Sequence, residues 1–108
     1  MKLRPEVQAF AEMMEAKLQE NAHKGGWKGC TTAYLSRRCG NELEELRSVV
    51  QRLHAWMRDN TFPSGRGPSL TDNADLSAEI GREAADVANF AMMLADVCGA
   101  LVRQKEAA

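Results

Sequence analysis

The sequence predicts an all-α fold, and three observations lead to this prediction. Apolar residues recur at helical spacing in one short N-terminal segment and in two long segments. No segment shows the strict apolar–polar alternation of a half-buried strand. Residues 61–75 are rich in Pro, Gly, Ser, Asp and Asn, which is typical of a loop. We therefore expect residues 1–108 to form a single domain, a helical bundle of one short and two long helices.

The first predicted helix covers about residues 5–23. Pro5 suits the first turn of a helix, where its missing N–H would have no intrahelical partner. The run ends at Gly25 and Gly26, which stop a helix readily. Its apolar residues recur at helical spacing: Val7, Phe10, Met14 and Leu18.

The second predicted helix begins at Thr31 or Thr32, either of which can cap a helix N-terminus, and runs to about Asn60. Gly40 lies inside this run, where glycine costs about 1 kcal/mol relative to alanine. A bend or short break at Gly40 would separate a small helix at about 32–38 from the main one. The apolar residues of the run form a seam with 4-3 spacing: Cys39, Leu43, Leu46, Val50, Leu53 and Met57.

The third predicted helix follows the loop, with Asp72, Asn73 or Asp75 as the candidate N-cap, and extends to about Arg103. Wide apolar stripes on three helices leave surface that a single chain of 108 residues does not cover. We therefore expect a homodimer or homotetramer built as a helical bundle. The third helix also has an apolar seam with 4-3 spacing: Ile80, Ala84, Val87, Ala91, Leu94, Cys98 and Leu101.

The composition argues against several classes of partner. The chain has a net charge of -1 with charges of both signs interspersed, so the basic footprint of a duplex nucleic-acid binder is missing. It has neither a signal-peptide pattern nor an apolar run of about 18 residues, so we expect no membrane association. The three cysteines cannot all pair with one another, and their spacing does not match a zinc site. These features predict a soluble, cytoplasmic protein.

Acidic residues interrupt the apolar pattern of both long helices. Relative to the seam of the third helix, Glu83 lies about 60° and Asp86 about 120° to one side, among apolar neighbours. On the second helix Glu42 and Glu45 are placed in the same way, whereas Glu44 falls on the other side of the seam. If the two seams pack antiparallel, the two acidic pairs converge.

Four carboxylates in one dry cleft would repel one another strongly unless cations lay between them. Mg²⁺ is the first candidate, with Mn²⁺ as the alternative, because hard cations take oxygen ligands. The position of the two pairs beside apolar seams is what favours a metal site. The spacing alone is weak support, because solvated helices often carry such pairs and the same pattern occurs elsewhere in this chain, at Glu12/Glu15 and Asp72/Asp75.

The segments ELEEL and EAADVANFAMMLADVCG resemble the MazG-like, all-α nucleoside triphosphate pyrophosphohydrolase family, whose pattern is an E-x-x-E helix followed by an E-x-x-D helix. FAEMMEAKLQENAHKGGW resembles the first helix and turn of small members, often from phages or bacteria. The resemblance implies that Glu42, Glu45, Glu83 and Asp86 bind Mg²⁺ and form the catalytic centre. It further implies cleavage of a (deoxy)nucleoside triphosphate between the α and β phosphates, in the cytoplasm of a bacterial or phage-infected cell.

One departure from the family pattern concerns the spacing of the two acidic pairs. Residues 46–82, 37 in all, separate the pairs, which is more than the motif usually has. The loop at 61–75 is therefore interpreted as an insertion that can act as a lid.

Further residues are candidates for binding the nucleotide. Asn89 lies one turn after the second acidic pair and can offer its amide to a sugar hydroxyl or a base edge, or form a polar contact between helices. Trp27 can stack on a base or close the end of the core. Lys17, Lys24 and Lys28 can meet phosphate oxygens, although lysines near helix ends are usually solvated.

The sequence leaves two classes of function open. The first is the Mg²⁺-dependent pyrophosphohydrolase that the resemblance implies. The second is a non-catalytic helical module, in which the long apolar seams serve oligomerisation or the binding of a partner.

Overall fold

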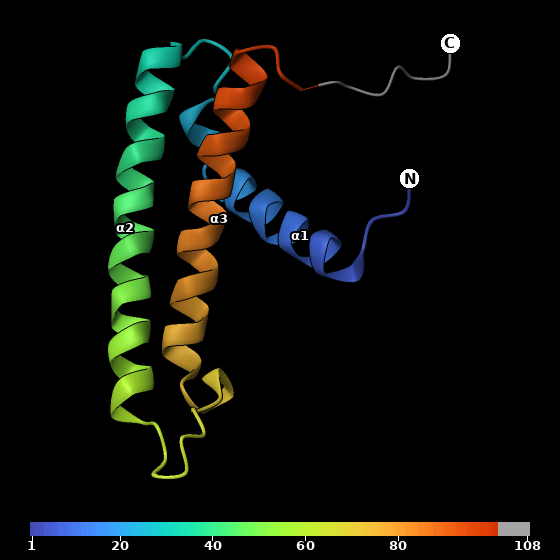
Figure 1. Cartoon of the computed structure of the whole chain (residues 1–108). Coiled ribbons are helices and arrows are strands. Elements are labelled where there is room, and N and C mark those ends of the chain that lie inside the picture. The colour runs from blue at the N-terminus through green and yellow to red at the C-terminus, as the bar shows by residue number, and fades with distance from the viewer. Residues whose placement is uncertain (102–108) are drawn as a thin grey trace.

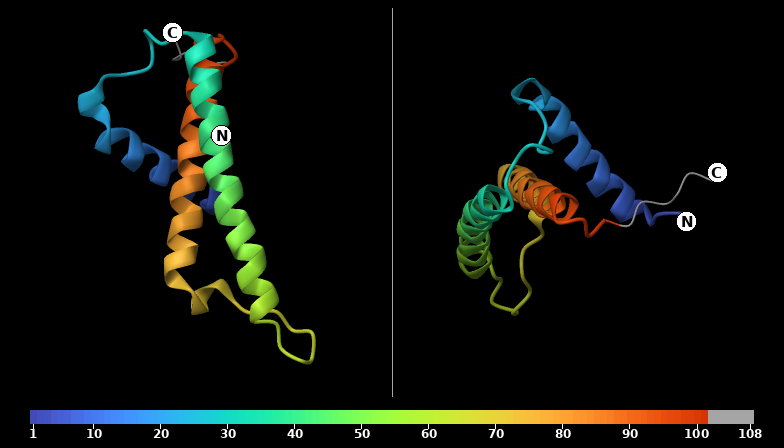
Figure 2. Two further views of the ribbon diagram at one scale, coloured as in Figure 1. Left: turned by 90° about the vertical axis from the view of Figure 1, so that its left-hand side faces the viewer. Right: turned by 90° about the horizontal axis from the view of Figure 1, so that it is seen from above.

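The computed structural model describes residues 1–101 and consists of helices joined by loops, with no strand among these residues. The three α-helices are α1 (Pro5–Glu20), α2 (Thr32–Asp59) and α3 (Ala74–Val97). Two short 3₁₀ helices, η1 (Ala22–Lys24) and η2 (Leu70–Asp72), lie in the connections. The all-α prediction is confirmed. α2 and α3 form a long antiparallel hairpin, and α1 projects from the side of α3 (Figures 1 and 2).

α1 begins at Pro5 as predicted but ends at Glu20 rather than at His23. After Glu20 the chain tightens into η1 and then reverses at Gly25, whose φ of 85° favours glycine. The shorter helix follows from this tightening, because the backbone bonds of η1 replace those of another α-helical turn.

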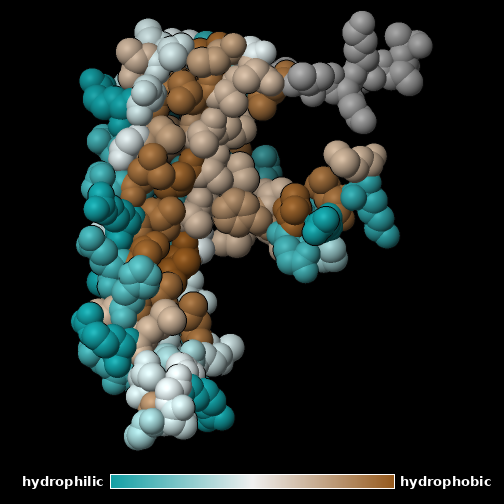
Figure 3. Space-filling view, in the orientation of Figure 1, coloured by the Kyte–Doolittle hydropathy of each residue, from teal (hydrophilic) through white to brown (hydrophobic). Residues whose placement is uncertain are grey.

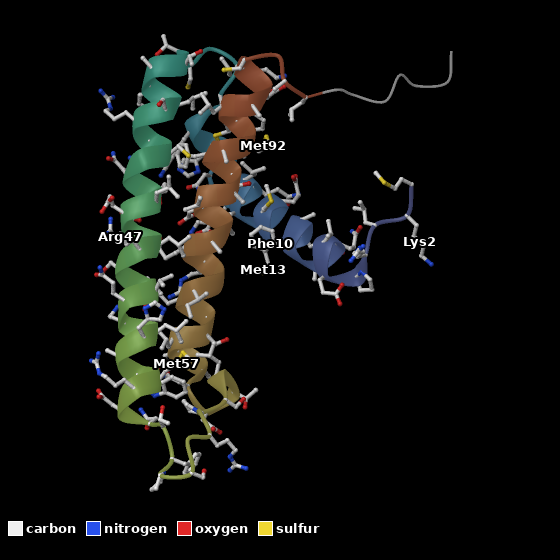
Figure 4. The ribbon with its side chains drawn as sticks, viewed as in Figure 1. Lys2, Phe10, Met13, Arg47, Met57 and Met92 are labelled. Carbon is white, nitrogen blue, oxygen red and sulfur yellow. The ribbon has the colours of Figure 1, made fainter. Side chains whose placement is uncertain are left out.

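α1 packs against α3 at a line of small residues. A Cβ atom at Gly81 would lie 2.9 Å from Cε of Met13, so glycine leaves room here for the end of the methionine side chain, which lies where α1 meets α3 (Figure 4). Ala85, four residues further along α3, is 3% exposed. Asn89, again four residues on, donates a hydrogen bond from Nδ2 to the backbone oxygen of Met14 at 3.1 Å. Residues spaced by four thus give α3 a face for α1, separate from its face for α2.

α2 is one continuous helix, so the predicted break at Gly40 is wrong. Thr31 caps it as predicted, with Oγ1 accepting a hydrogen bond from the backbone N–H of Tyr34 at 3.1 Å. Gly40 is exposed, and nothing lies within 4 Å of the place where its Cβ would stand. Packing of α2 against α3 on both sides of this position outweighs the cost of glycine, about 1 kcal/mol.

α3 begins with one of the three predicted caps, since Oδ1 of Asn73 accepts from the backbone N–H of Leu76 at 3.2 Å. The helix ends at Val97, earlier than predicted. Gly99 adopts a φ of 75°, its N–H bonds to the oxygen of Asp96 at 3.0 Å, and the N–H of Ala100 bonds to the oxygen of Ala95 at 2.9 Å. This pair of bonds is the Schellman motif, a standard helix stop. The predicted end, Arg103, lies outside the described residues, and Leu101 lies beyond the helix.

The hairpin buries a different line of α2 from the predicted seam. The buried residues of α2 are Leu35, Glu42 and Val49, which follow one another at intervals of seven, whereas Leu43 and Met57 of the seam are 49% and 42% exposed. α3 covers only one side of α2, and the predicted seam lies at the edge of the covered side. Figure 3 shows hydrophobic residues gathered in a strip along the length of the pair.

The chain is elongated, with a small core. Its radius of gyration is 17.3 Å, whereas a compact domain of about 100 residues has about 13 Å. Four apolar residues are buried in the described part of the chain: Leu35, Val49, Leu76 and Ala85. The expected oligomer would cover more apolar surface, and it stays a prediction. None of the helices of residues 1–101 combines the length and the apolar character that a membrane span requires.

The loop between α2 and α3 matches the predicted segment 61–75 closely, except that it contains η2 and that α3 starts at Ala74. It lies at the far end of the hairpin (Figure 1). Glu42 is 17 residues before the end of α2 at Asp59, which corresponds to about 25 Å of helix. Along α3, Glu83 is nine residues after Ala74, which corresponds to about 14 Å of helix. The interpretation of the loop as a lid stays a prediction.

Gly99, which follows the end of α3, and Gly40, which lies inside α2, predict opposite effects of alanine on stability. Gly99→Ala should lower the free energy of unfolding by about 1–2 kcal/mol, because a side chain disfavours the left-handed conformation of the helix stop. Gly40→Ala should raise it by about 0.5–1 kcal/mol, since the site is helical and open. Urea unfolding at matched protein concentration measures both. A neutral Gly99→Ala variant would contradict the Schellman stop.

Candidate metal centre and adjoining pocket

Three of the four predicted carboxylates converge where α2 and α3 lie side by side. Glu42, Glu45 and Glu83 can each present one oxygen such that these atoms all lie within 4.8 Å of one another. We call these three residues the carboxylate cluster. The E-x-x-E spacing places the two glutamates of α2 on one face, and the antiparallel hairpin brings α3 to that face. Asp86 is not part of the cluster, although its charge acts on Glu42.

Burial and mutual repulsion perturb the acids of the site. The pKa of Glu42 rises from 4.5 to about 7, first because the side chain is buried and then because Glu45 and Asp86 are close, while Arg38 opposes the shift. Burial also raises the pKa of Glu83, and the charges of Glu45 and Asp86 add to this effect. The pKa of Asp86 is raised by burial and held down in part by Lys17. The site therefore carries more negative charge than its own cations offset.

Two oxygens of the cluster are buried and have no hydrogen-bond partner in the described part of the chain: Oε2 of Glu42 and Oε2 of Glu83. Buried polar atoms are nearly always hydrogen-bonded, so these two oxygens are available to accept a cation or a hydrogen-bond donor. Carboxylate oxygens held close together are the ligands that Mg²⁺ and Mn²⁺ prefer. The residues present therefore fit a hard divalent cation.

A pocket of about 450 Å³ adjoins the cluster at Glu42 and is lined by residues of all three α-helices. It contains five of the residues that the sequence predicts for the site: Lys17, Lys24, Glu42, Asp86 and Asn89. Lys17 Nζ lies 4.0 Å from Asp86 Oδ1. The pocket thus combines acids that can hold a cation with lysines that can meet an anion.

Asn89 fulfils one of its two predicted roles in the structure, the polar contact between helices. Its Nδ2 is committed to the backbone oxygen of Met14, which ties α3 to α1. Its Oδ1 is buried and has no partner among residues 1–101, and the residue, 3% exposed, borders the pocket. That oxygen can accept a hydrogen bond from a ligand in the pocket.

Trp27 lies outside this pocket and borders a neighbouring hollow of about 220 Å³. Its Nε1 donates to Oδ2 of Asp96 at 2.9 Å, and Lys28 Nζ lies 3.1 Å from the same oxygen. Asp96 therefore holds both Trp27 and Lys28 at the end of α3. The two hollows share Tyr34 and Phe90, so the hollow at Trp27 is an aromatic extension of the pocket.

Six of the eleven residues that line the pocket were not predicted for the site, and Arg38 and Tyr34 are the two of them that come from α2. Arg38 has its Nη2 3.3 Å from Oε1 of Glu42 and its Cζ 5.0 Å from the centre of the Phe90 ring. Tyr34, one turn earlier on α2, also lines the pocket. The available signal was the spacing of four residues from Arg38 to Glu42, which places both on one helix face.

No protein-family model, curated protein or solved structure matches the chain. The resemblance to the MazG-like family therefore stays a prediction.

Because the pKa of Glu42 is raised, replacing this residue by a neutral one should stabilise the fold by an amount that depends on the pH. The folded chain binds this proton more tightly than the unfolded chain, so stability should fall as the pH rises from about 4.5 to about 7. Without divalent cations, Glu42→Gln should raise the free energy of unfolding by about 2–3 kcal/mol at pH 8. At pH 5, where Glu42 is mostly protonated, the gain should be small.

Urea unfolding of both proteins at the two pH values measures this difference. Glu44→Gln is the control, because Glu44 is exposed and lies outside the cluster. An equal gain at pH 5 and pH 8 for Glu42→Gln would show that burial of charge is not its cause.

Proposed function

We propose that the chain is an Mg²⁺-dependent pyrophosphohydrolase that cleaves a (deoxy)nucleoside triphosphate between the α and β phosphates, giving a monophosphate and pyrophosphate. The observation that carries the proposal is the pair of buried, unpartnered oxygens of Glu42 and Glu83, in a cluster that opens onto a pocket bordered by cationic side chains. The resemblance of the acidic pairs to the MazG-like family supports the same reaction. Mn²⁺ is the alternative cation.

The acids of the site have complementary roles in this proposal. Glu42, Glu45 and Glu83 hold the cation, and Asp86 adds a fourth carboxylate at the pocket. A divalent cation bound there supplies polarisation of the phosphate oxygens and acidifies an attacking water. One glutamate of the first pair accepts the proton of that water.

The remaining pocket residues position the nucleotide. Lys17 and Lys24 offer ammonium groups to the phosphates, as their place in the pocket allows. The free Oδ1 of Asn89 accepts from a sugar hydroxyl or a base amino group. Trp27 borders the aromatic extension, where a base can stack against a ring. Fixing the substrate against the acids in this way is the main contribution of the protein to the rate.

We also propose that the enzyme works as a cytoplasmic homodimer or homotetramer. The elongated shape and the half-exposed Leu43 and Met57 support association, because further copies can cover apolar surface that one chain leaves in water. The exposed strip also supports the competing function, a non-catalytic interaction module.

A product assay separates the two functions. The purified chain is incubated with each dNTP and NTP and Mg²⁺, and pyrophosphate and orthophosphate are quantified separately. Pyrophosphate release from at least one nucleotide supports the proposal. Absence of release from all of them favours the interaction module, and release of orthophosphate alone contradicts cleavage between the α and β phosphates.

Glu83→Gln tests the acids directly. The variant should lose about 100-fold or more of the turnover, since loss of a metal ligand costs at least as much as loss of a group that supports one. Its helical fold should be intact or more stable, because the change relieves repulsion in the cluster. Turnover by pyrophosphate release and stability by urea unfolding are measured on the same samples.

Glu44→Gln is the matched control on the same helix as Glu42 and Glu45. It should keep near-normal turnover, because Glu44 is exposed and borders neither the cluster nor the pocket. Near-normal turnover of Glu83→Gln would remove Glu83 from the proposed metal centre.

A further inference from the structure

Arg38 has no role in the reaction as described so far, although it occupies the boundary between the carboxylate cluster and the pocket. Its Nη2 lies 3.3 Å from Oε1 of Glu42, and its Cζ stands 5.0 Å from the centre of the Phe90 ring. These two contacts hold the guanidinium plane but use few of its five N–H donors. The side chain is 39% exposed, and the residue lines the pocket.

The charges around the pocket show what Arg38 does in the absence of a ligand. Arg38 pairs with Glu42, and Lys17 lies 4.0 Å from Asp86, so each acid of the pocket has a cation beside it. A divalent cation in the cluster would need Glu42 as a ligand and would repel the guanidinium. Arg38 would then share the charge of Glu42 with the cation, while Phe90 still supported the guanidinium at the pocket.

The anion that suits a supported guanidinium at this place is a phosphate group. A guanidinium offers parallel N–H donors that match two phosphate oxygens, which an ammonium group cannot do. Glu42 and Asn89, both less than one-tenth exposed, each have an oxygen without a partner in the part of the chain that the structure describes, and both border the pocket. Those atoms accept a cation or a donor, so the pocket is prepared for a ligand that carries a cation together with phosphate.

We propose that Arg38 is the residue that binds the polyphosphate of the substrate, and that it passes from Glu42 to the phosphate oxygens when cation and nucleotide bind. The inference rests on the proposed function and deepens it. Because Arg38 and the cation carry like charges beside the same carboxylate, the cation alone binds more weakly than the cation with polyphosphate. Binding of the two is therefore cooperative, and each raises the affinity of the other by the same factor.

The test uses Ca²⁺ and inorganic tripolyphosphate as probes, measured by isothermal titration calorimetry on the full chain. Ca²⁺ takes the same oxygen ligands as Mg²⁺. Arg38→Met removes the charge but keeps an unbranched apolar stem over Phe90. It should weaken tripolyphosphate binding in the presence of Ca²⁺ by about 10- to 100-fold. Binding of Ca²⁺ alone should be unchanged or tighter.

Two further variants control the measurement. Arg47→Met removes the same charge from the same helix, but Arg47 is exposed and points away from α3 (Figure 4), so tripolyphosphate binding should be unchanged. Arg38→Lys keeps the charge but lacks the planar guanidinium group. Its affinity for tripolyphosphate should therefore lie between those of Arg38→Met and the wild type. Circular dichroism confirms that each variant keeps its helices.

The outcomes separate the two proposals. Equal tripolyphosphate affinity of the wild type, Arg38→Met and Arg47→Met overturns the role of Arg38, while pyrophosphate release by the wild type would leave the proposed function standing. A selective loss in Arg38→Met without any nucleotide cleavage by the wild type supports Arg38 as a polyphosphate ligand and overturns the hydrolase. A wild type that binds no tripolyphosphate overturns the role of Arg38.

Discussion

The burial of the Glu42 carboxylate between two helices is the constraint on which the rest of this structure depends. Glu42 occupies the middle of the line Leu35, Glu42 and Val49, where a helix that packed only for stability would place an apolar side chain. A buried charge costs free energy unless something pairs with it. Arg38 pairs with one oxygen of Glu42, and the other has no partner in the described chain. The chain thus gives up some stability at the place where a cation can restore it.

The position of α1 decides whether this acidic centre has a pocket. Lys17 belongs to α1 and Lys24 to η1, so two of the three cationic side chains of the pocket depend on the docking of α1, whereas Arg38 belongs to α2. The hydrogen bond from Asn89 to Met14 ties α1 to α3 at this docking site, and Gly81 leaves room there for the end of the Met13 side chain. Asn89 therefore joins two functions, since its amide nitrogen holds the helices together while its oxygen stays available to the pocket.

Features that depend on a few neighbouring residues could be predicted well. Thr31 and Asn73 cap their helices because a side-chain oxygen three residues before a free N–H needs no tertiary partner. The end of α3 at Gly99 depends on equally local hydrogen bonds. It was not predicted, because the apolar spacing continues past Gly99 to Leu101 and indicated a longer helix. Gly40 shows the reverse case, because packing on both sides kept α2 continuous where local propensity allowed a break.

The sequence by itself determined the three helices, the loop between the long ones and the faces that carry the acidic pairs, because helical periodicity is a local property. Only the tertiary structure decided that α2 turns Glu42 rather than its apolar seam toward α3, and that Asp86 stays outside the cluster. It also decided that Arg38 lies over Phe90 at the pocket. These outcomes depend on how each helix is rotated about its own axis when it packs. One residue corresponds to about 100° of that rotation, so contacts between distant segments select the buried face.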